Sequence, residues 1–158
     1  MINLGFTGTQ TGMTLEQKAA VRGLLPQVEF TLHHGDCIGA DAQVHELCRT
    51  RPKLARIVIH PPVNQDKRAC CSLEPEFAGF AIMPRRPYLD RNKRIVVAGV
   101  DGLIGTPKEM SEPARLRAGG TWATIRMARR AGRFIAIVWP DGTISMENGT
   151  KTWDLFLF

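Results

Sequence analysis

Short apolar runs alternate along the chain with segments whose apolar residues recur at helical spacing. Runs of this length, bounded by Gly, Pro and polar residues, are typical of buried strands. The pattern predicts five strands, at residues 2–7, 28–33, 57–60, 102–105 and 134–139.

The intervening segments predict helices. Thr14-Leu15-Glu16-Gln17 has the form of a capping box and opens a helix that runs to about residue 25. Three further amphipathic segments predict helices at 41–49, 88–98 and 125–131. Residues 61–87 and 108–118 are predicted to be loops, and residues 144–158 a final strand or a packing surface.

Strands that alternate with helices indicate an α/β fold, in which helices cover both faces of a mostly parallel sheet. The length of 158 residues favours a single domain over residues 1–158, with 141–158 as a C-terminal extension. Ligands of such sheets bind beyond the carboxyl ends of the strands. We therefore expect one cleft formed by residues 7–12, residues 35–41, the segment after Ile104 and residues 119–124.

Composition narrows the class of protein. The chain is 44% hydrophobic and 23% charged, which is ordinary for a globular domain. No apolar stretch is long enough to span a bilayer, and no signal peptide is recognisable, so we expect no membrane partner and a cytoplasmic location. The four cysteines, at positions 37, 48, 70 and 71, include no CxxC pair and are expected to be reduced thiols.

The net charge of +6 is unevenly distributed. Basic clusters favour phosphates, as nucleotides or as nucleic acid, although a solvated basic surface is the simpler interpretation of any single arginine. One cluster surrounds two consecutive glycines and the other follows the loop 61–87: Arg115, Arg117, Arg126, Arg129, Arg130 and Arg133; and Arg85, Arg86, Arg91, Lys93 and Arg94.

Gly119-Gly120-Thr121-Trp122-Ala123-Thr124 lies immediately before the last predicted helix. The first N–H groups of a helix have no internal partner, and together with the helix dipole they attract an anion. Glycines allow a phosphate to approach the backbone, and Thr121 or Thr124 adds a hydroxyl. Trp122 offers a flat face for a base or a sugar. This segment predicts a phosphate site.

The loop after the first strand, which contains Gly8, Thr9 and Gln10, is a second candidate for phosphate or ribose binding. Its spacing matches neither GxGxxG nor a Walker loop, so ordinary dinucleotide dehydrogenases and phosphate-loop NTPases are poor matches. A plain turn before a capped helix is the alternative.

Residues 33–45 carry two acids, Asp36 and Asp41, that could hold ribose hydroxyls or orient a water. His, Cys and Asp in one segment also invite a metal interpretation, but the paired spacing of metal motifs is absent and no metal is expected. The alternative is structural, with Asp41 capping the helix and His45 satisfied locally.

The helix predicted at 88–98 begins with Tyr88 and carries Arg91 and Asn92. Arg91 can form a forked contact with a phosphate or carboxylate, and Asn92 can bridge backbone or ligand. An arginine that ties two loops together is nearly as good an interpretation.

Three of these blocks, taken together, resemble the SLOG superfamily, which includes the Smf/DprA DNA-processing proteins and the LOG-type nucleotide phosphoribohydrolases. The resemblance covers roughly residues 1–140, and the blocks have the superfamily's order and spacing: Gly35-Asp36 with Gly39-Ala40-Asp41 and His45; Arg91-Asn92 with Ile95-Val96; and Gly119 to Thr124 with Ala128.

The resemblance implies a Rossmann-like three-layer sandwich, with a mostly parallel central sheet of five or more strands, that binds nucleotides or nucleotide-derived ligands. The phosphate would lie on Gly119, Gly120, Thr121 and Thr124. Arg91 and Asn92 would border the same pocket, and Gly35 with Asp41 would form its other wall.

The chain departs from the hydrolases at one position that bears on catalysis. LOG-type enzymes carry a catalytic Glu shortly after the glycines, where this chain has Arg126. An arginine cannot act as a general base, so Asp36, Asp41 or Glu109 would have to replace that acid. Whether a bond is cleaved stays open, and no cofactor is assigned.

Two functions follow as expectations. The first is a stand-alone SLOG domain that binds a nucleotide or nucleotide-derived phosphate ligand, as a sensor or a specialised nucleotide-processing protein. The alternative is a DprA-like module for single-stranded nucleic acid, with Trp122, Tyr88 and Phe134 as stacking partners. The apolar C-terminal tail would suit a homo-oligomer contact.

Overall fold

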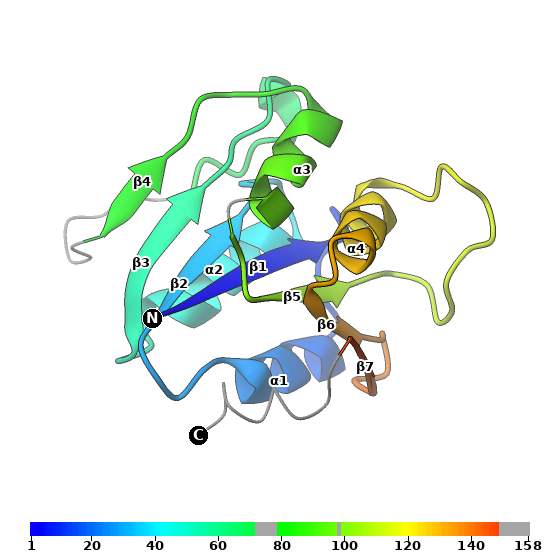
Figure 1. Ribbon diagram of the computed structural model, residues 1–158, viewed down its shortest axis with the longest axis horizontal. Coiled ribbons are helices and arrows are strands. Elements are labelled where there is room, and N and C mark those ends of the chain that lie inside the picture. The colour runs from blue at the N-terminus through cyan, green and yellow to red at the C-terminus, as the bar shows by residue number, and fades with distance from the viewer. Residues whose placement is uncertain (72–78, 98, 149–158) are drawn as a thin grey trace.

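The computed structural model describes residues 1–71, 79–97 and 99–148, which form an α/β sandwich around one mostly parallel sheet (Figure 1). The strand order is β4-β3-β2-β1-β5-β6-β7, and only β7 runs antiparallel to its neighbour. The strands are β1 (Ile2–Gly8), β2 (Phe30–His34), β3 (Leu54–Ile59), β4 (Phe80–Ile82), β5 (Gly102–Thr106), β6 (Phe134–Val138) and β7 (Ile144–Glu147).

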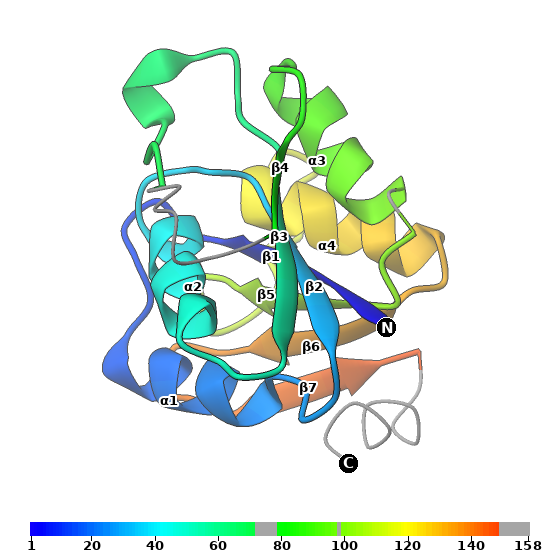
Figure 2. The same cartoon turned by 90° about the vertical axis from the view of Figure 1, so that its left-hand side faces the viewer.

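Helices cover both faces of the sheet, with α1 and α2 on one side and α3 and α4 on the other (Figure 2). Thr14 caps α1 through both bonds of the predicted capping box with Gln17, each 3.0 Å long. No helix of the described residues has the length and apolarity needed to cross a bilayer. The helices are α1 (Leu15–Leu24), α2 (Ala40–Arg49), α3 (Tyr88–Val97) and α4 (Gly120–Arg130).

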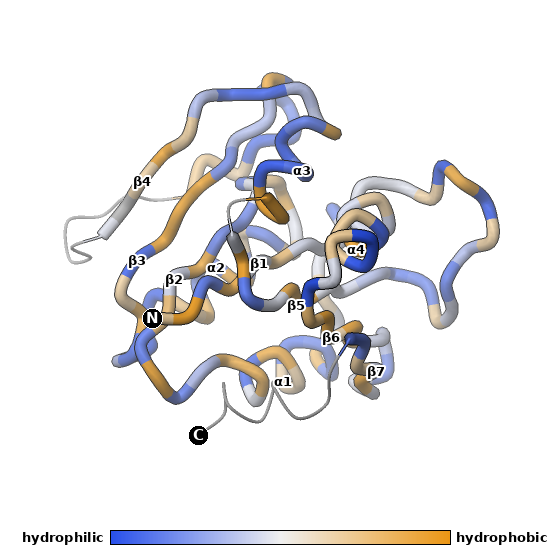
Figure 3. Tube along the Cα trace, viewed as in Figure 1, coloured by the Kyte–Doolittle hydropathy of each residue, from blue (hydrophilic) through white to orange (hydrophobic). Residues whose placement is uncertain are grey.

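Alternation of side chains along the strands divides the interior into two cores. Ile104 and Ala136 pack on the side of α1 and α2, whereas Leu103 and Ile135 pack on the side of α4. Successive residues of a strand point to opposite faces, so a strand buried on both faces is apolar throughout. Figure 3 shows this pattern as hydrophobic colour along β6.

The α/β class and the mostly parallel sheet are confirmed, and the predicted strands and helices are present with shifted ends. The prediction that residues 61–87 form a loop is wrong in part. This segment contains the edge strand β4, which pairs with Ile57–Ile59 of β3, and a single 3-10 turn at Gln65–Lys67. A strand of three residues is too short to produce a period-2 pattern.

The tail is strand β7 up to Glu147, paired antiparallel with β6. The expected packing surface around Trp153 and Phe156 lies outside the described residues. The last helix begins at Gly120, five residues earlier than its apolar pattern suggested, so the glycine pair belongs to the helix start itself.

The strand order reverses at β1, which lies between β2 and β5. Helices that leave neighbouring strands there go to opposite faces, and the loops diverge to leave a crevice at the carboxyl ends. Gly8 ends β1 and Thr106 ends β5. The start of α4 faces this same crevice.

Two glycines should respond oppositely to alanine. Gly23 lies exposed in α1 with open space where a Cβ would be, so Gly23→Ala should raise the free energy of unfolding by about 0.5–1 kcal/mol. A Cβ on Gly8 would collide with the side chains of Thr106 and Ala40, so Gly8→Ala should lower it by about 1–3 kcal/mol. Urea unfolding measures both, and equal effects would contradict the packing at the end of β1.

Candidate functional site

A pocket of about 320 Å³ lies at the carboxyl ends of β1 and β5, at the reversal of strand order. This volume is within the range of small-molecule sites. We call it the switch-point pocket. Its lining combines the first loop, the start of α3 and the segment from 108 to 122: Gly8, Thr9, Gln10, Thr11, Tyr88, Lys108, Glu109, Arg115, Ala118, Gly119, Gly120, Thr121 and Trp122.

The start of α4 presents backbone donors at this pocket. Gly119 is the N-cap, with φ of 96°, and contributes no side-chain cap. Among the described residues, none accepts a hydrogen bond from the backbone N–H of Gly120, Thr121 or Trp122. Ala123 is the first residue whose N–H is satisfied, by the Gly119 carbonyl at 3.0 Å. Unsatisfied donors at a helix start form an anion site.

Tyr88 explains why position 120 is glycine. A Cβ there would occupy the place of the phenol ring of Tyr88, which stands over the helix start. Burial raises the pKa of the Tyr88 hydroxyl above its ordinary value, so the phenol is neutral and serves as a hydrogen-bonding wall. The sequence analysis gave Tyr88 two roles, as the first residue of a helix and as a stacking partner in the nucleic-acid alternative.

The threonines of α4 have different roles. Thr121 is half-buried and lines the pocket. Thr124, expected to contact the phosphate, is fully buried and donates its hydroxyl to the Gly120 carbonyl at 2.9 Å. Asn92 donates to that same carbonyl at 3.4 Å and so links α3 to α4. Neither Thr124 nor Asn92 lines the pocket, and both stabilise the start of α4.

Trp122 does not present the flat face that the sequence suggested. Its side chain is only 1% exposed and belongs to the core beneath α4. The indole lies 5.9 Å from the ring of Trp139, and its N–H donates to Glu109 Oε2 at 3.1 Å. Trp122 therefore orients Glu109, and only a small part of it reaches the pocket.

The loop 108–118 supplies the charges of the pocket. Lys108 and Arg115 bring positive charge, and Glu109 is the only acid among the described lining residues. Sequence reasoning named Glu109 among three possible acids and gave Lys108 no role. This loop directly precedes the glycines but matches no binding motif, so its only signal was the basic charge that includes Arg115.

Two arginines of the basic cluster around α4 bind other groups of the protein. Arg126 donates to Glu112 and to the carbonyls of Pro113, Arg115 and Leu116, which fastens the loop 112–116 to the helix. Arg129 pairs with both Glu112 and Glu147. These bonds leave neither guanidinium directed at the pocket.

The remaining predicted residues form a buried polar network between α2, α3 and the loop after β2. Asp41 Oδ2 accepts from the N–H groups of Gly35 and Cys37, each at 3.1 Å, and lies 3.8 Å from Arg91. Asp41 is the second residue of α2 and does not cap it, because Gly39 is the N-cap. Burial raises the pKa of Asp41 to about 6, although Arg91 opposes this rise.

Arg91 fills the space beside Gly35, where a Cβ would collide with its guanidinium. It also donates to Cys37 Sγ at 3.3 Å and lies 4.7 Å from the centre of the Tyr88 ring. Asp36 is fully buried, pairs with Arg68 at 2.7 Å and accepts from the Cys71 N–H at 2.9 Å. Gly35, Asp36, Asp41 and Arg91 thus hold loops together outside the switch-point pocket.

Four histidines lie in two buried pairs: His34 Nε2 with His45 Nδ1 at 3.0 Å, and His33 Nδ1 with His60 Nε2 at 3.1 Å. His34, His45 and Cys71 have ligand atoms within 4.8 Å of one another. However, His34 Nδ1 accepts from the Asp36 N–H, so the proton of the neutral ring is on Nε2. A metal would need that nitrogen unprotonated, and burial raises the pKa of the Cys71 thiol, so the donor set does not fit a metal ion.

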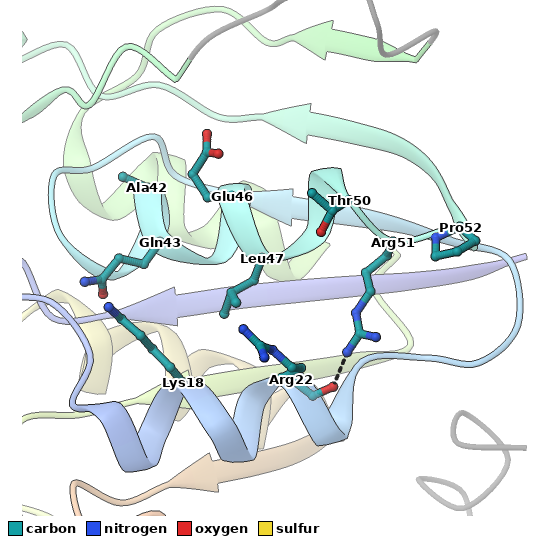
Figure 4. Close-up of a pocket in the computed structure, with 9 residues that line it drawn as sticks. All are labelled: Lys18, Arg22, Ala42, Gln43, Glu46, Leu47, Thr50, Arg51 and Pro52. Carbon is teal, nitrogen blue, oxygen red and sulfur yellow. Dashed lines mark hydrogen bonds between the residues drawn. The ribbon is translucent and has the colours of Figure 1, made fainter.

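A wider hollow of about 820 Å³ lies between α1 and α2 and has no lining residue in common with the switch-point pocket (Figure 4). Lys18, Arg22 and Arg51 border it, and Arg51 donates to the Arg22 carbonyl at 2.6 Å across one end. It lies beside two helices and not at the carboxyl ends of the strands, where ligands of such sheets bind. The switch-point pocket is therefore the better candidate for a small ligand.

Comparison of the chain with protein-family models, with curated proteins and with solved structures found no match in any of the three. The fold and the pocket define the class of protein as an α/β sandwich with a pocket at its strand reversal.

The buried histidines predict how stability depends on pH. Burial lowers the pKa of His33 and of His60 to about 4, and that of His34 well below its usual range. Between pH 4 and 6.5 the unfolded chain binds more protons at these positions, so the free energy of unfolding should rise with pH across this window. Asp41, with its raised pKa, opposes the trend but is a single group.

Urea unfolding at pH 4.5, 5.5 and 6.5 measures this slope. His60→Gln keeps a hydrogen-bonding amide opposite His33 and removes one titrating group, so its slope should be shallower than that of the wild type. A slope that is zero or negative in the wild type would contradict the neutral, buried state of the pairs.

Proposed function

We propose that the chain binds a nucleotide or nucleotide-derived ligand in the switch-point pocket, with the phosphate on the start of α4. The observation that carries the proposal is the set of unpartnered N–H groups of Gly120, Thr121 and Trp122 at the pocket wall. Lys108 and Arg115 add positive charge beside them. Backbone donors, a helix dipole and two cations all favour a phosphate.

Glu109 supports a sugar beside that phosphate. The Trp122 indole holds Oε2, which leaves Oε1 to accept hydrogen bonds from a ligand. A carboxylate placed next to a phosphate site is the usual partner of ribose hydroxyls in nucleotide folds. The volume of about 320 Å³ suits a mononucleotide better than a dinucleotide.

With such a ligand the protein would act as a sensor or a specialised nucleotide-processing domain, as the SLOG resemblance implies. Of the three acids that could replace the superfamily's catalytic Glu, Asp36 and Asp41 are engaged in the buried network. Only Glu109 lines the pocket. Cleavage of an N-glycosidic bond would therefore depend on Glu109.

Fewer observations favour the nucleic-acid alternative. Of its three expected stacking partners, Trp122 lies in one core and Phe134 packs against the other, and Tyr88 lines the pocket. Arg126 and Arg129, which supplied much of the basic cluster, are held by acids and carbonyls of the protein. A small nucleotide requires none of these groups.

Nucleotide binding should appear as thermal stabilisation. A ligand at 100 times its Kd stabilises a protein by about 2.7 kcal/mol, which is several degrees of melting temperature. Nucleoside mono- and diphosphates should give this shift, and Thr121→Val should reduce the affinity about tenfold because it removes a hydroxyl from the pocket wall.

Thr50→Val is the matched control, since Thr50 borders the hollow between α1 and α2 instead. It should leave the shift unchanged. Absence of stabilisation by any phosphate-bearing nucleotide, or an equal loss in both variants, would reject the proposal.

Glu109 should determine a preference for ribose. The wild type should bind a ribonucleotide about tenfold more tightly than its 2′-deoxy form, because the deoxy form leaves the carboxylate without one partner. Glu109→Gln keeps an acceptor for Trp122 and should reduce this ratio to within a factor of about three. Calorimetry measures the ratio, Glu46→Gln at the α1–α2 hollow is the control, and an unchanged ratio would remove Glu109 from the sugar site.

A further inference from the structure

A small second hollow lies at the carboxyl ends of β3 and β4, where it is separated from the switch-point pocket by the Tyr88–Arg91 contact. Its volume is about 30 Å³, and His60, Met83, Pro84, Arg86, Arg91 and Arg94 line it. We call it the arginine hollow. His60 follows β3 and Met83 follows β4, so the hollow shares the sheet edge at which ligands of such folds bind.

Three guanidinium groups border the arginine hollow, and no acid is among its described lining residues. Arg91 is the deepest of them, with 3% of its surface exposed. Its terminal nitrogens meet Cys37 and Asp41, but its Nε has no hydrogen-bond partner among the described residues. A buried N–H of a cation without a partner is costly, so this donor favours an acceptor supplied from outside the chain.

The fold holds the other two arginines in place by different means. The backbone of Arg86 is hydrogen-bonded to the segment after β3. Its N–H donates to the Pro61 carbonyl, and its carbonyl accepts from the N–H of Val63. Arg94 lies on the exposed side of α3, one turn after Arg91. One buried and two more exposed guanidiniums can approach the same anion from several directions.

The pKa of His60 reflects its burial and the positive charges around the arginine hollow. Burial is the main cause that lowers its pKa to about 4, and the charges of His33, Arg91 and Arg94 contribute to the same shift. The imidazole is therefore neutral near pH 7 and adds no repelling or attracting charge of its own. The excess of positive charge at the hollow comes from the guanidiniums.

We propose that the arginine hollow binds a phosphoryl group. Guanidinium donors arranged around one small space match the oxygens of a tetrahedral oxyanion. The hollow, at about 30 Å³, is too small for a base or a sugar, so the oxygens nearest the guanidiniums would enter it and the rest of the group would stay outside. The phosphoryl group comes either from a second phosphate of a ligand whose nucleoside occupies the switch-point pocket, or from a separate phosphate ion.

Inorganic phosphate tests the hollow directly, with His60 as the reporter. Bound phosphate brings negative charge beside the imidazole, so the pKa of His60, followed by its NMR ring signals, should rise as phosphate is added. Arg94→Gln removes one guanidinium from the hollow and should weaken phosphate binding at least fivefold. Arg94 is exposed, so its replacement should leave the fold intact.

Lys93→Gln is the matched control, because it removes the same charge from the next, exposed position of α3 outside the hollow. It should change phosphate affinity less than twofold. A pKa of His60 that does not respond to phosphate would overturn the proposal. Equal weakening by Arg94→Gln and Lys93→Gln would also overturn it, since that result describes a general basic surface.

Nucleotides distinguish the two sources of the phosphoryl group. If the phosphoryl group belongs to the ligand of the switch-point pocket, Arg94→Gln should weaken the binding of a nucleoside diphosphate and leave the binding of a monophosphate unchanged. If it is a separate ion, phosphate should shift His60 equally with and without nucleotide. Thr121→Val should leave the phosphate response of His60 unchanged, so failure of the nucleotide site and failure of the arginine hollow produce different results.

Discussion

The backbone N–H groups at the start of α4 have no partner among the described residues because β1 lies between β2 and β5. The helices that follow β1 and β5 pack on opposite faces of the sheet. The loops at the carboxyl ends of these strands therefore diverge and cannot satisfy one another's backbone groups. Gly119 and Gly120 allow the helix to begin there without side chains over its amides, and Tyr88 occupies the space beside Gly120. Topology thus creates the crevice, and two glycines keep its donors accessible.

The polar residues near this edge separate into two groups with opposite roles. Asp41 pairs with Arg91 and Asp36 pairs with Arg68, and both acids accept hydrogen bonds from the loop backbone in the interior, where an unpaired charge would be costly. Lys108, Glu109 and Arg115 face the pocket from a loop. The buried network keeps the loop after β2 rigid against α3, and Arg91 extends from it to the arginine hollow. A single residue therefore connects the scaffold with the second proposed site.

The excess of positive charge has a similar division. Arg126 and Arg129 bind acids and carbonyls of the chain, and their role is to fold the loop 112–116 onto α4. That loop carries Arg115 and follows the pair of Lys108 and Glu109, so the arginines of the helix position the charges of the pocket indirectly. Lys108 and Arg115 lie at the strand ends, where the start of α4 already favours an anion.

Local patterns in the sequence determined the α/β class, the capping box at Thr14 and the position of most elements, because each depends on neighbours in the chain. The three-residue strand β4 escaped prediction because only its pairing with β3 makes it a strand. The tertiary structure alone decided which candidate residues face the pocket. Thr124 and Trp122 are buried, Arg91 pairs with Asp41, and Glu109 accepts a hydrogen bond from Trp122. A side chain's partner across the fold depends on long-range packing, which a pattern of neighbouring residues does not contain.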